Sequence, residues 1–174
     1  MRKLIGLNIA QYWYRVSAFL AVMFVILLSD AILSDFVPGY IQSTVGSASR
    51  MGWVMATSSI VGIVMDIVFP QLLRSTGVKK LAGMAIIGAI VFLLALWGST
   101  WVWPVLLILL GMAAWGVYYE LDAFMTKQFV AKVAPAHARG VVWGVVGTFR
   151  NLAYLVGPIL GGMIAINGER WTRA

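Results

Sequence analysis

The sequence predicts an all-α membrane protein whose helices cross the bilayer several times. Of its 174 residues, 61% are hydrophobic and 11% are charged, whereas a typical soluble domain is about half apolar and about one quarter charged. Apolar runs of about twenty residues recur five times, and each is long enough, at ~1.5 Å per residue, to cross a hydrocarbon core of about 30 Å. Backbone amides in lipid must bond within their own segment, so these runs are predicted to be helices.

Aromatic and basic residues mark where the first three helices end. The first, residues 16–40, follows Arg15 and ends at Tyr40. The second, residues 51–73, stops before Arg74, and the third, residues 81–97, begins after a pair of lysines. These residue types favour the membrane–water interface, so their positions support the predicted boundaries.

The last two helices are predicted at residues 102–125 and 141–166. The connection at residues 98–101 is so short that the third and fourth helices must form a tight hairpin. Residues 1–15 are interpreted as a cytoplasmic amphipathic leader. Residues 167–174 are interpreted as an external tail that leads into a missing sixth helix, which fits either a fragment of a longer protein or an open reading frame that is cut short.

Basic residues predict the orientation, because lysine and arginine in short loops are retained on the cytoplasmic side. With the N-terminus in the cytoplasm, nine basic residues lie inside, namely Arg2, Lys3, Arg15, Arg74, Lys79, Lys80, Lys127, Lys132 and Arg139. Three lie outside, namely Arg50, Arg170 and Arg173. The expected location is therefore the cytoplasmic membrane (plasma or cell inner membrane). This topology accounts for the net charge of +7 without nucleic acid as a partner.

Three charged residues lie well inside the predicted spans: Asp30, Asp66 and Arg150. Each costs about 2.5–3.5 kcal/mol near mid-bilayer, so they should face a hydrated cavity or pair with one another. Counted from the basic anchors at ~1.5 Å per residue, Arg150 lies ~17 Å deep, between Asp66 at ~12 Å and Asp30 at ~22 Å. Arg150 is therefore predicted to pair with one of these carboxylates. A purely structural ion pair is the alternative.

Glu120 is a further candidate near the inner end of the fourth span, because Tyr118, Tyr119 and Glu120 follow the flexible Gly111 and Gly116. The alternative is an ordinary interfacial charge. The sequence has no cysteine, no metal-ligand cluster, no phosphate loop and no Ser-His-Asp set. We therefore expect neither an enzyme nor a cofactor.

Three segments carry a resemblance to a known family. GPILGG at residues 157–162 matches the G-P-x-x-G-G core of a motif in the fifth helix of the major facilitator superfamily, and PAHARG at residues 135–140 is similar to the entry into that helix. Residues 70–80 resemble a degraded form of the family's loop between helices two and three. In that loop Gly77, Lys79 and Lys80 match.

The resemblance has departures. Pro70 replaces the first glycine of the loop motif and Arg74 its aspartate, while Ala153 replaces the leading glycine of the longer fifth-helix motif. Leu107 stands where many members have a fourth-helix arginine, so the proton-relay group proposed there is absent. The similarity covers the first five of the family's twelve helices.

The resemblance implies a secondary active transporter that moves a small solute by alternating access, with proton coupling as an option. Its implied partners are the solute, the lipid bilayer, protons and the C-terminal half of the transporter. The candidate residues of the substrate and proton pathway are Asp30, Asp66, Glu120, Arg150 and Asn151. The conformational motif consists of Gly157, Pro158, Gly161 and Gly162, and the loop motif of Gly77, Lys79 and Lys80.

The glycines and proline of the fifth helix also have a physical interpretation. Glycines about four residues apart, such as Gly157 with Gly161, and likewise Gly140, Gly144 and Gly147, make a flat face against which a neighbouring helix packs closely. A proline removes an amide donor and bends the helix. This combination suits a helix that moves against another, although static packing explains it equally. The alternative function is a membrane scaffold or assembly protein that is complete at five helices.

Overall fold

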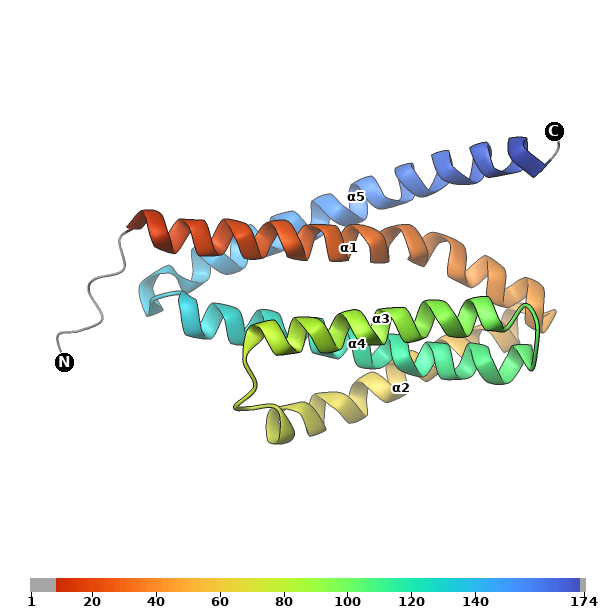
Figure 1. Ribbon diagram of the computed structural model, residues 1–174, viewed down its shortest axis with the longest axis horizontal. Coiled ribbons are helices and arrows are strands. Elements are labelled where there is room, and N and C mark those ends of the chain that lie inside the picture. The colour runs from red at the N-terminus through yellow and green to blue at the C-terminus, as the bar shows by residue number, and fades with distance from the viewer. Residues whose placement is uncertain (1–8, 173–174) are drawn as a thin grey trace. The chain divides into compact units, whose positions relative to one another are not determined.

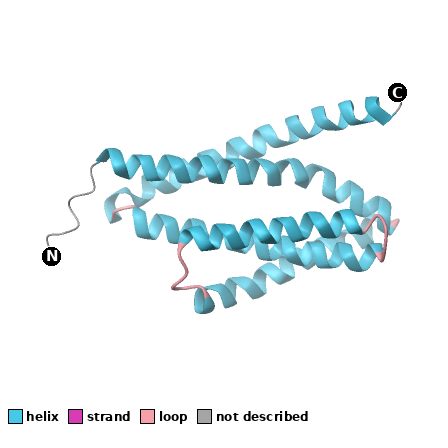
Figure 2. Cartoon of the chain, viewed as in Figure 1, coloured by secondary structure: helices cyan, strands magenta, loops and turns pink. Residues whose placement is uncertain are grey.

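The computed structural model describes the backbone of residues 9–172 and the side chains of residues 12–164 (Figure 1). Its elements are α1 (Ile9–Val45), α2 (Ala48–Leu72), α3 (Val78–Gly98), α4 (Pro104–Val133), a short 3-10 helix η1 (Ala136–Ala138) and α5 (Arg139–Thr172). Helices are the only regular elements in this part of the chain (Figure 2). The predicted all-α polytopic membrane fold is confirmed.

The helices are longer than the apolar runs that predicted them. Helix α1 begins at Ile9 within the expected leader, and α4 continues through two lysines to Val133. Helix α5 extends to Thr172, into the segment expected to be a tail. Hydropathy marks only the part of a helix that sits in hydrocarbon, whereas backbone hydrogen bonding continues through the polar interface.

Four helices of the described chain are long and apolar enough to cross a membrane, over Tyr12–Val45, Ala48–Leu72, Val78–Gly98 and Pro104–Val133. Only the described residues bear on this comparison, and the side chains of α5 are described as far as residue 164. Over that part of the chain α5 is an apolar helix that carries Arg150 and Asn151 in its central turns.

The chain forms two compact units. The first, called the α1–α5 unit, combines α1 as far as Val37 with the chain from Val130 onward, including η1 and α5. The second, called the α2–α4 unit, comprises residues 38–129 and so contains the end of α1, all of α2 and α3, and most of α4. Each unit is described below by itself.

In the α1–α5 unit, α1 and α5 pack against each other (Figure 1). The rings of Phe24 and Phe149 meet edge to face, with their centroids 6.1 Å apart. The buried face of α1 recurs every three or four residues, as expected for one side of a helix, and consists of Val16, Leu20, Met23, Leu27 and Ala31.

In the α2–α4 unit, α3 and α4 form the hairpin that the short connection predicted, and they run side by side (Figure 1). The rings of Phe92 on α3 and Trp115 on α4 lie 4.2 Å apart. Helix α2 also packs against α4, where the ring centroids of Phe69 on α2 and Phe124 on α4 lie 6.5 Å apart. Helix α4 is therefore the shared partner of α2 and α3.

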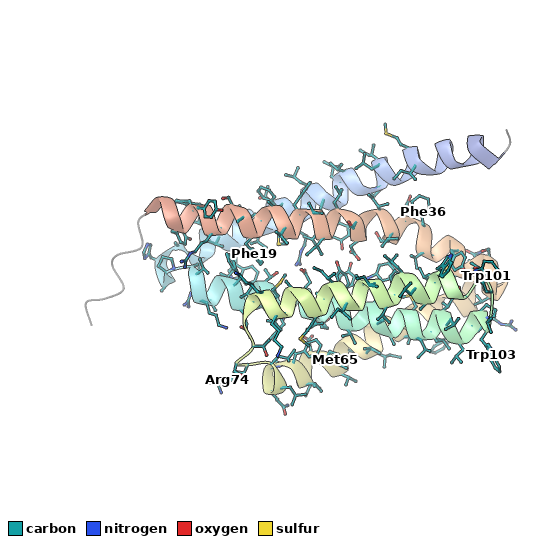
Figure 3. All side chains as sticks on the ribbon, viewed as in Figure 1. Phe19, Phe36, Met65, Arg74, Trp101 and Trp103 are labelled. Carbon is teal, nitrogen blue, oxygen red and sulfur yellow. The ribbon has the colours of Figure 1, made fainter. Side chains whose placement is uncertain are left out.

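Large apolar side chains project outward from α2 and α3 (Figure 3). Ile67, Ile87 and Leu94 are each more than half exposed. A contiguous apolar surface of this kind is unfavourable in water and marks contact with another apolar phase. For helices of this length that phase is the lipid bilayer, so the chain is an integral membrane protein.

Candidate functional site

Helices α2 and α4 approach each other closely at two glycines. A Cβ atom on Gly116 would overlap the backbone of Ser58, and one on Gly62 would lie 3.2 Å from Oε1 of Glu120. Each glycine precedes an acidic residue on its own helix by four positions, since Asp66 follows Gly62 as Glu120 follows Gly116. Residues four apart share a helix face, so the close contact of the glycines brings the two carboxyl groups together.

These residues line a cavity of about 390 Å³, called the carboxylate cavity. Its lining consists of Ser58, Ser59, Gly62, Ile63, Asp66, Gly116, Tyr119 and Glu120. Hydroxyl, phenol and carboxyl groups therefore converge in a space that is large enough for a small solute. This is the arrangement of polar groups in an apolar surround that is typical of a binding site.

The two carboxyl groups of the cavity lie beside a lysine. Asp66 and Glu120 both line the cavity, and Nζ of Lys127 lies 3.9 Å from Oδ1 of Asp66. The cluster thus combines two acidic side chains with one basic side chain.

The carboxylate cavity is open. The side chains of Lys127 and Asp66 are 60% and 61% exposed, and Glu120 is half-buried. At this exposure and separation the ion pair contributes about 0–1 kcal/mol to stability. The Asp66 carboxylate is therefore not covered by other described residues of the chain.

The α1–α5 unit contains a different acidic site, in which Asp30 is only 3% exposed. The hydroxyl of Tyr154 on α5 donates to Oδ2 of Asp30 at 2.5 Å. One helical turn away, a Cβ atom on Gly157 would overlap the Cβ of Ala31, so the backbones of α1 and α5 approach closely there. The glycine thus allows a short hydrogen bond between a phenol and a buried carboxylate.

The other predicted pathway residues lie apart from these contacts. Arg150 and Asn151 are exposed on α5. Within the described part of the α1–α5 unit, Asp30 bonds to Tyr154, and Arg150 makes no ion pair with it. Pairing of Arg150 with Asp66, whose ion pair is with Lys127, stays a prediction.

The fifth-helix motif contributes two packing glycines. Besides Gly157, Gly161 faces α1, where a Cβ atom would lie 3.2 Å from the ring of Phe36. Gly162 has no neighbour within 4 Å of such an atom. Pro158 is exposed, and α5 continues through it without a break. The face of α5 that approaches α1 is therefore the one formed by Gly157 and Gly161.

The second glycine series of α5 has no such neighbour. Within the α1–α5 unit, a Cβ atom on Gly140, Gly144 or Gly147 would meet nothing within 4 Å. The expectation that this face packs closely against a helix is not met inside the unit. Similarly, Gly116 is a packed residue within continuous α4 and not a flexible joint.

The loop motif lies where α2 ends and α3 begins. Gly77 is the N-cap residue of α3, and Lys79 and Lys80 are exposed in its first turn. The end of α2 is fixed by α4, because Nε2 of Gln128 donates to the carbonyl oxygen of Leu73 at 3.2 Å. The motif therefore forms an exposed basic connection next to an anchored helix end.

Two residues of these sites were not singled out from the sequence. Tyr154 lies four positions after Arg150, well inside an apolar span, where a phenol needs a hydrogen-bond partner. Lys127 lies seven positions, about two helical turns, after Glu120 and so on the same face of α4. Helix-face counting within a single span is the signal that would have found both.

The fold is that of a polytopic membrane protein with a cavity lined by polar side chains between α2 and α4. The family model described as "Major Facilitator Superfamily" matches residues 11–172. The chain therefore belongs to the major facilitator superfamily, and it is a transporter of that type. Comparisons with curated proteins and with solved structures gave no significant match.

Proposed function

We propose that the chain carries out secondary active transport of a small solute by alternating access, and that transport is coupled to protons. The observation that supports this most directly is the carboxylate cavity, which Asp66 and Glu120 line together beside Lys127. A solute entering the cavity competes for these groups. Its binding is thereby linked to the gain or loss of one proton.

The two carboxyl groups have different roles in this proposal. Asp66 is the partner of the cation, because it faces the ammonium group of Lys127. Glu120 is less exposed and lies against Gly62, so we assign to it the proton that is exchanged during transport. Loss of that proton places a further negative charge in the cavity, which favours either reprotonation or binding of a solute that donates hydrogen bonds.

The remaining predicted residues have supporting roles. Asp30, held by Tyr154, acts in the packing of α1 against α5, and the glycines of α5 give a smooth face on which that contact can shift. A second helical bundle, the C-terminal half in the family's architecture, completes the pathway. The membrane is the cytoplasmic membrane, with the N-terminus in the cytoplasm.

Proton coupling is tested with Glu120→Gln. Glutamine keeps the size of the side chain and a donor toward Asp66, but it cannot release a proton. The purified full chain is reconstituted in proteoliposomes with a pH-sensitive dye inside, and solutes are screened for proton movement. We expect the variant to abolish solute-induced proton movement while its thermal stability in detergent stays unchanged.

The matched control is Asp35→Asn, which removes an exposed carboxylate of α1 outside the carboxylate cavity. It should retain solute-induced proton movement. Undiminished proton movement in Glu120→Gln would place the coupling group elsewhere and overturn the proposal for this cavity.

The orientation is tested with reporter fusions in the connections between helices. We expect fusions after Ser75 and His137 to report a cytoplasmic position and fusions after Ser47 and Thr100 an external one. A cytoplasmic signal after Ser47 would reverse the topology.

A further inference from the structure

A second cavity, of about 440 Å³, lies at the end of the α2–α4 unit where α1 turns into α2. It is called the interfacial cavity and is lined by Thr44, Val45, Arg50, Trp53, Val54, Val105 and Leu109. The hydroxyl groups of Tyr40 and Ser99 lie 2.7 Å apart, which fixes the end of α1 beside the turn between α3 and α4. The cavity is therefore an open one, lined by α1, α2 and α4 at one end of the unit.

The lining of the interfacial cavity is apolar except at one end. Val45, Val54, Val105 and Leu109 form its walls, and Arg50 is its only charged residue. The Arg50 side chain is exposed and makes no hydrogen bond or ion pair with any other residue that the structure describes. Five guanidinium donors are thus available beside an apolar cavity.

The position of Arg50 in its helix is also unusual. It lies in the first turn of α2, whose N-cap is Ser47, and that turn contains no acidic residue. The first turn of a helix carries a partial positive charge, so a cation is unfavourable there and an anion favourable. A bound anion would offset both the helix dipole and the guanidinium charge.

Exposed tryptophans surround this end of the unit. Trp53 on the cavity wall is 76% exposed, and Trp101 and Trp103 project from the turn between α3 and α4 (Figure 3). Tryptophan rings favour the headgroup level of a bilayer, where one edge is wet and the other apolar. The interfacial cavity therefore lies at a membrane–water interface, with Arg50 at the headgroup level.

We propose that the interfacial cavity binds an anionic phospholipid. Its guanidinium group at Arg50 engages the lipid phosphate with two N–H donors. The aliphatic walls at Val54, Val105 and Leu109 accept the start of an acyl chain. A lipid is favoured over a soluble phosphate compound because most of the lining is apolar. This proposal does not depend on the transport mechanism proposed above.

The test is a lipid titration of the purified full chain in detergent, with bound lipid counted by native mass spectrometry. Phosphatidylglycerol and phosphatidylcholine of the same acyl chains are compared. We expect about fivefold tighter binding of phosphatidylglycerol, from one basic residue acting on one anionic headgroup. Arg50→Gln should remove this preference, and Arg50→Lys should retain part of it, since lysine keeps the charge but not the planar fork.

The matched control is Arg74→Gln, which removes an exposed arginine from the connection between α2 and α3. It should keep the preference. If Arg50→Gln does not fold, Val105→Glu tests the same point, because it places a carboxylate on an exposed wall position of the interfacial cavity and should repel the anionic lipid.

Three results would overturn the proposal. One is equal binding of the two lipids by the unmodified chain, and another is an unchanged preference in the Arg50→Gln or Val105→Glu variant. The third is displacement of phosphatidylglycerol by glycerol 3-phosphate at equal concentration, which would show that the cavity recognises a free phosphate and not a lipid.

Discussion

The two units use glycine in the same way but place their acidic groups in opposite environments. In the α1–α5 unit, Gly157 brings α5 against α1, and the neighbouring Asp30 is buried and bonded to Tyr154. In the α2–α4 unit, Gly116 brings α4 against α2, and the neighbouring carboxyl groups line an open cavity. A close helix contact therefore does not by itself decide whether an acid holds the fold or exchanges protons.

The difference arises from the partner that each acid meets. A phenol satisfies a buried carboxylate with one neutral donor and fixes its position, because a buried acid without a partner is costly. A second carboxyl group in the same cavity and an exposed lysine, as at Asp66, leave the acid able to change partners. In the proposal made above, the first contact is structural and the second belongs to the transport pathway.

The largest expected effect tests the contact of α2 with α4. Gly116→Leu places a side chain where the backbone of Ser58 lies, and backbone cannot move aside as a side chain can. We expect a loss of about 3 kcal/mol or more in the free energy of unfolding, measured in detergent. Gly144→Leu, at a glycine with no neighbour within 4 Å in its unit, is the control. An equal loss in both variants would mean that leucine is poorly tolerated for reasons unrelated to helix contact.

The contact of α1 with α5 is tested with Gly157→Ala, whose new methyl group meets the Cβ of Ala31. We expect a destabilisation of about 1–3 kcal/mol, part of which Ala31→Gly recovers in the double variant, because it removes the opposing methyl group. Gly144→Ala, which meets no neighbour, should instead gain up to about 1 kcal/mol from helix propensity. Strict additivity of the two substitutions would show that the helices do not touch at this point.

The buried acid is tested with Tyr154→Phe, which removes the hydroxyl that donates to Asp30. Such a hydrogen bond contributes about 0.5–1.5 kcal/mol between neutral groups and about 1.5–3 kcal/mol when one group is charged, so we expect a loss of about 0.5–3 kcal/mol in thermal unfolding. In combination with Asp30→Asn the loss should be smaller than the sum of the two single losses. Tyr14→Phe, at a phenol that is 73% exposed, should change stability little.

A second double-mutant cycle distinguishes the Tyr154–Asp30 hydrogen bond from the ion pair with Arg150 that was predicted from depth along the helices. Arg150→Leu and Asp30→Asn should be additive within about 0.5 kcal/mol, because the two side chains do not pair. The same cycle with Asp66→Asn tests the other predicted partner of Arg150. Coupling of more than about 1 kcal/mol with Asp66 would establish that pair as a further contact of the transport site.

The smallest expected effect concerns the exposed ion pair of the carboxylate cavity. Lys127→Met should change the unfolding free energy by at most about 1 kcal/mol, since the pair is long and more than half exposed. Solute-induced proton movement should nevertheless change, because Asp66 loses its cation. A large loss of stability with unchanged proton movement would make this acid structural, like Asp30, and would remove the distinction between the two units.

The sequence was sufficient to predict the membrane-spanning helices, the tight hairpin of α3 with α4 and the family. It also identified Asp30, Asp66 and Glu120 as unusual, because a carboxyl group in an apolar span is costly wherever it points. Depth along a helix was predictable from its constant rise per residue. These properties depend on composition and on position within one segment, so they are readable without knowledge of neighbours.

Only the tertiary structure decided which groups meet. Depth placed Arg150 between two carboxylates, but it could not show that Tyr154 bonds to Asp30 or that Lys127 lies beside Asp66. The physical reason is that a helix in lipid can be apolar on every side, so hydropathy fails to show which face is buried. The contacts are set instead by where the backbones of two helices approach closely. Such an approach requires a glycine of one helix to lie opposite a residue of another, as Gly116 lies opposite Ser58 and Gly157 opposite Ala31.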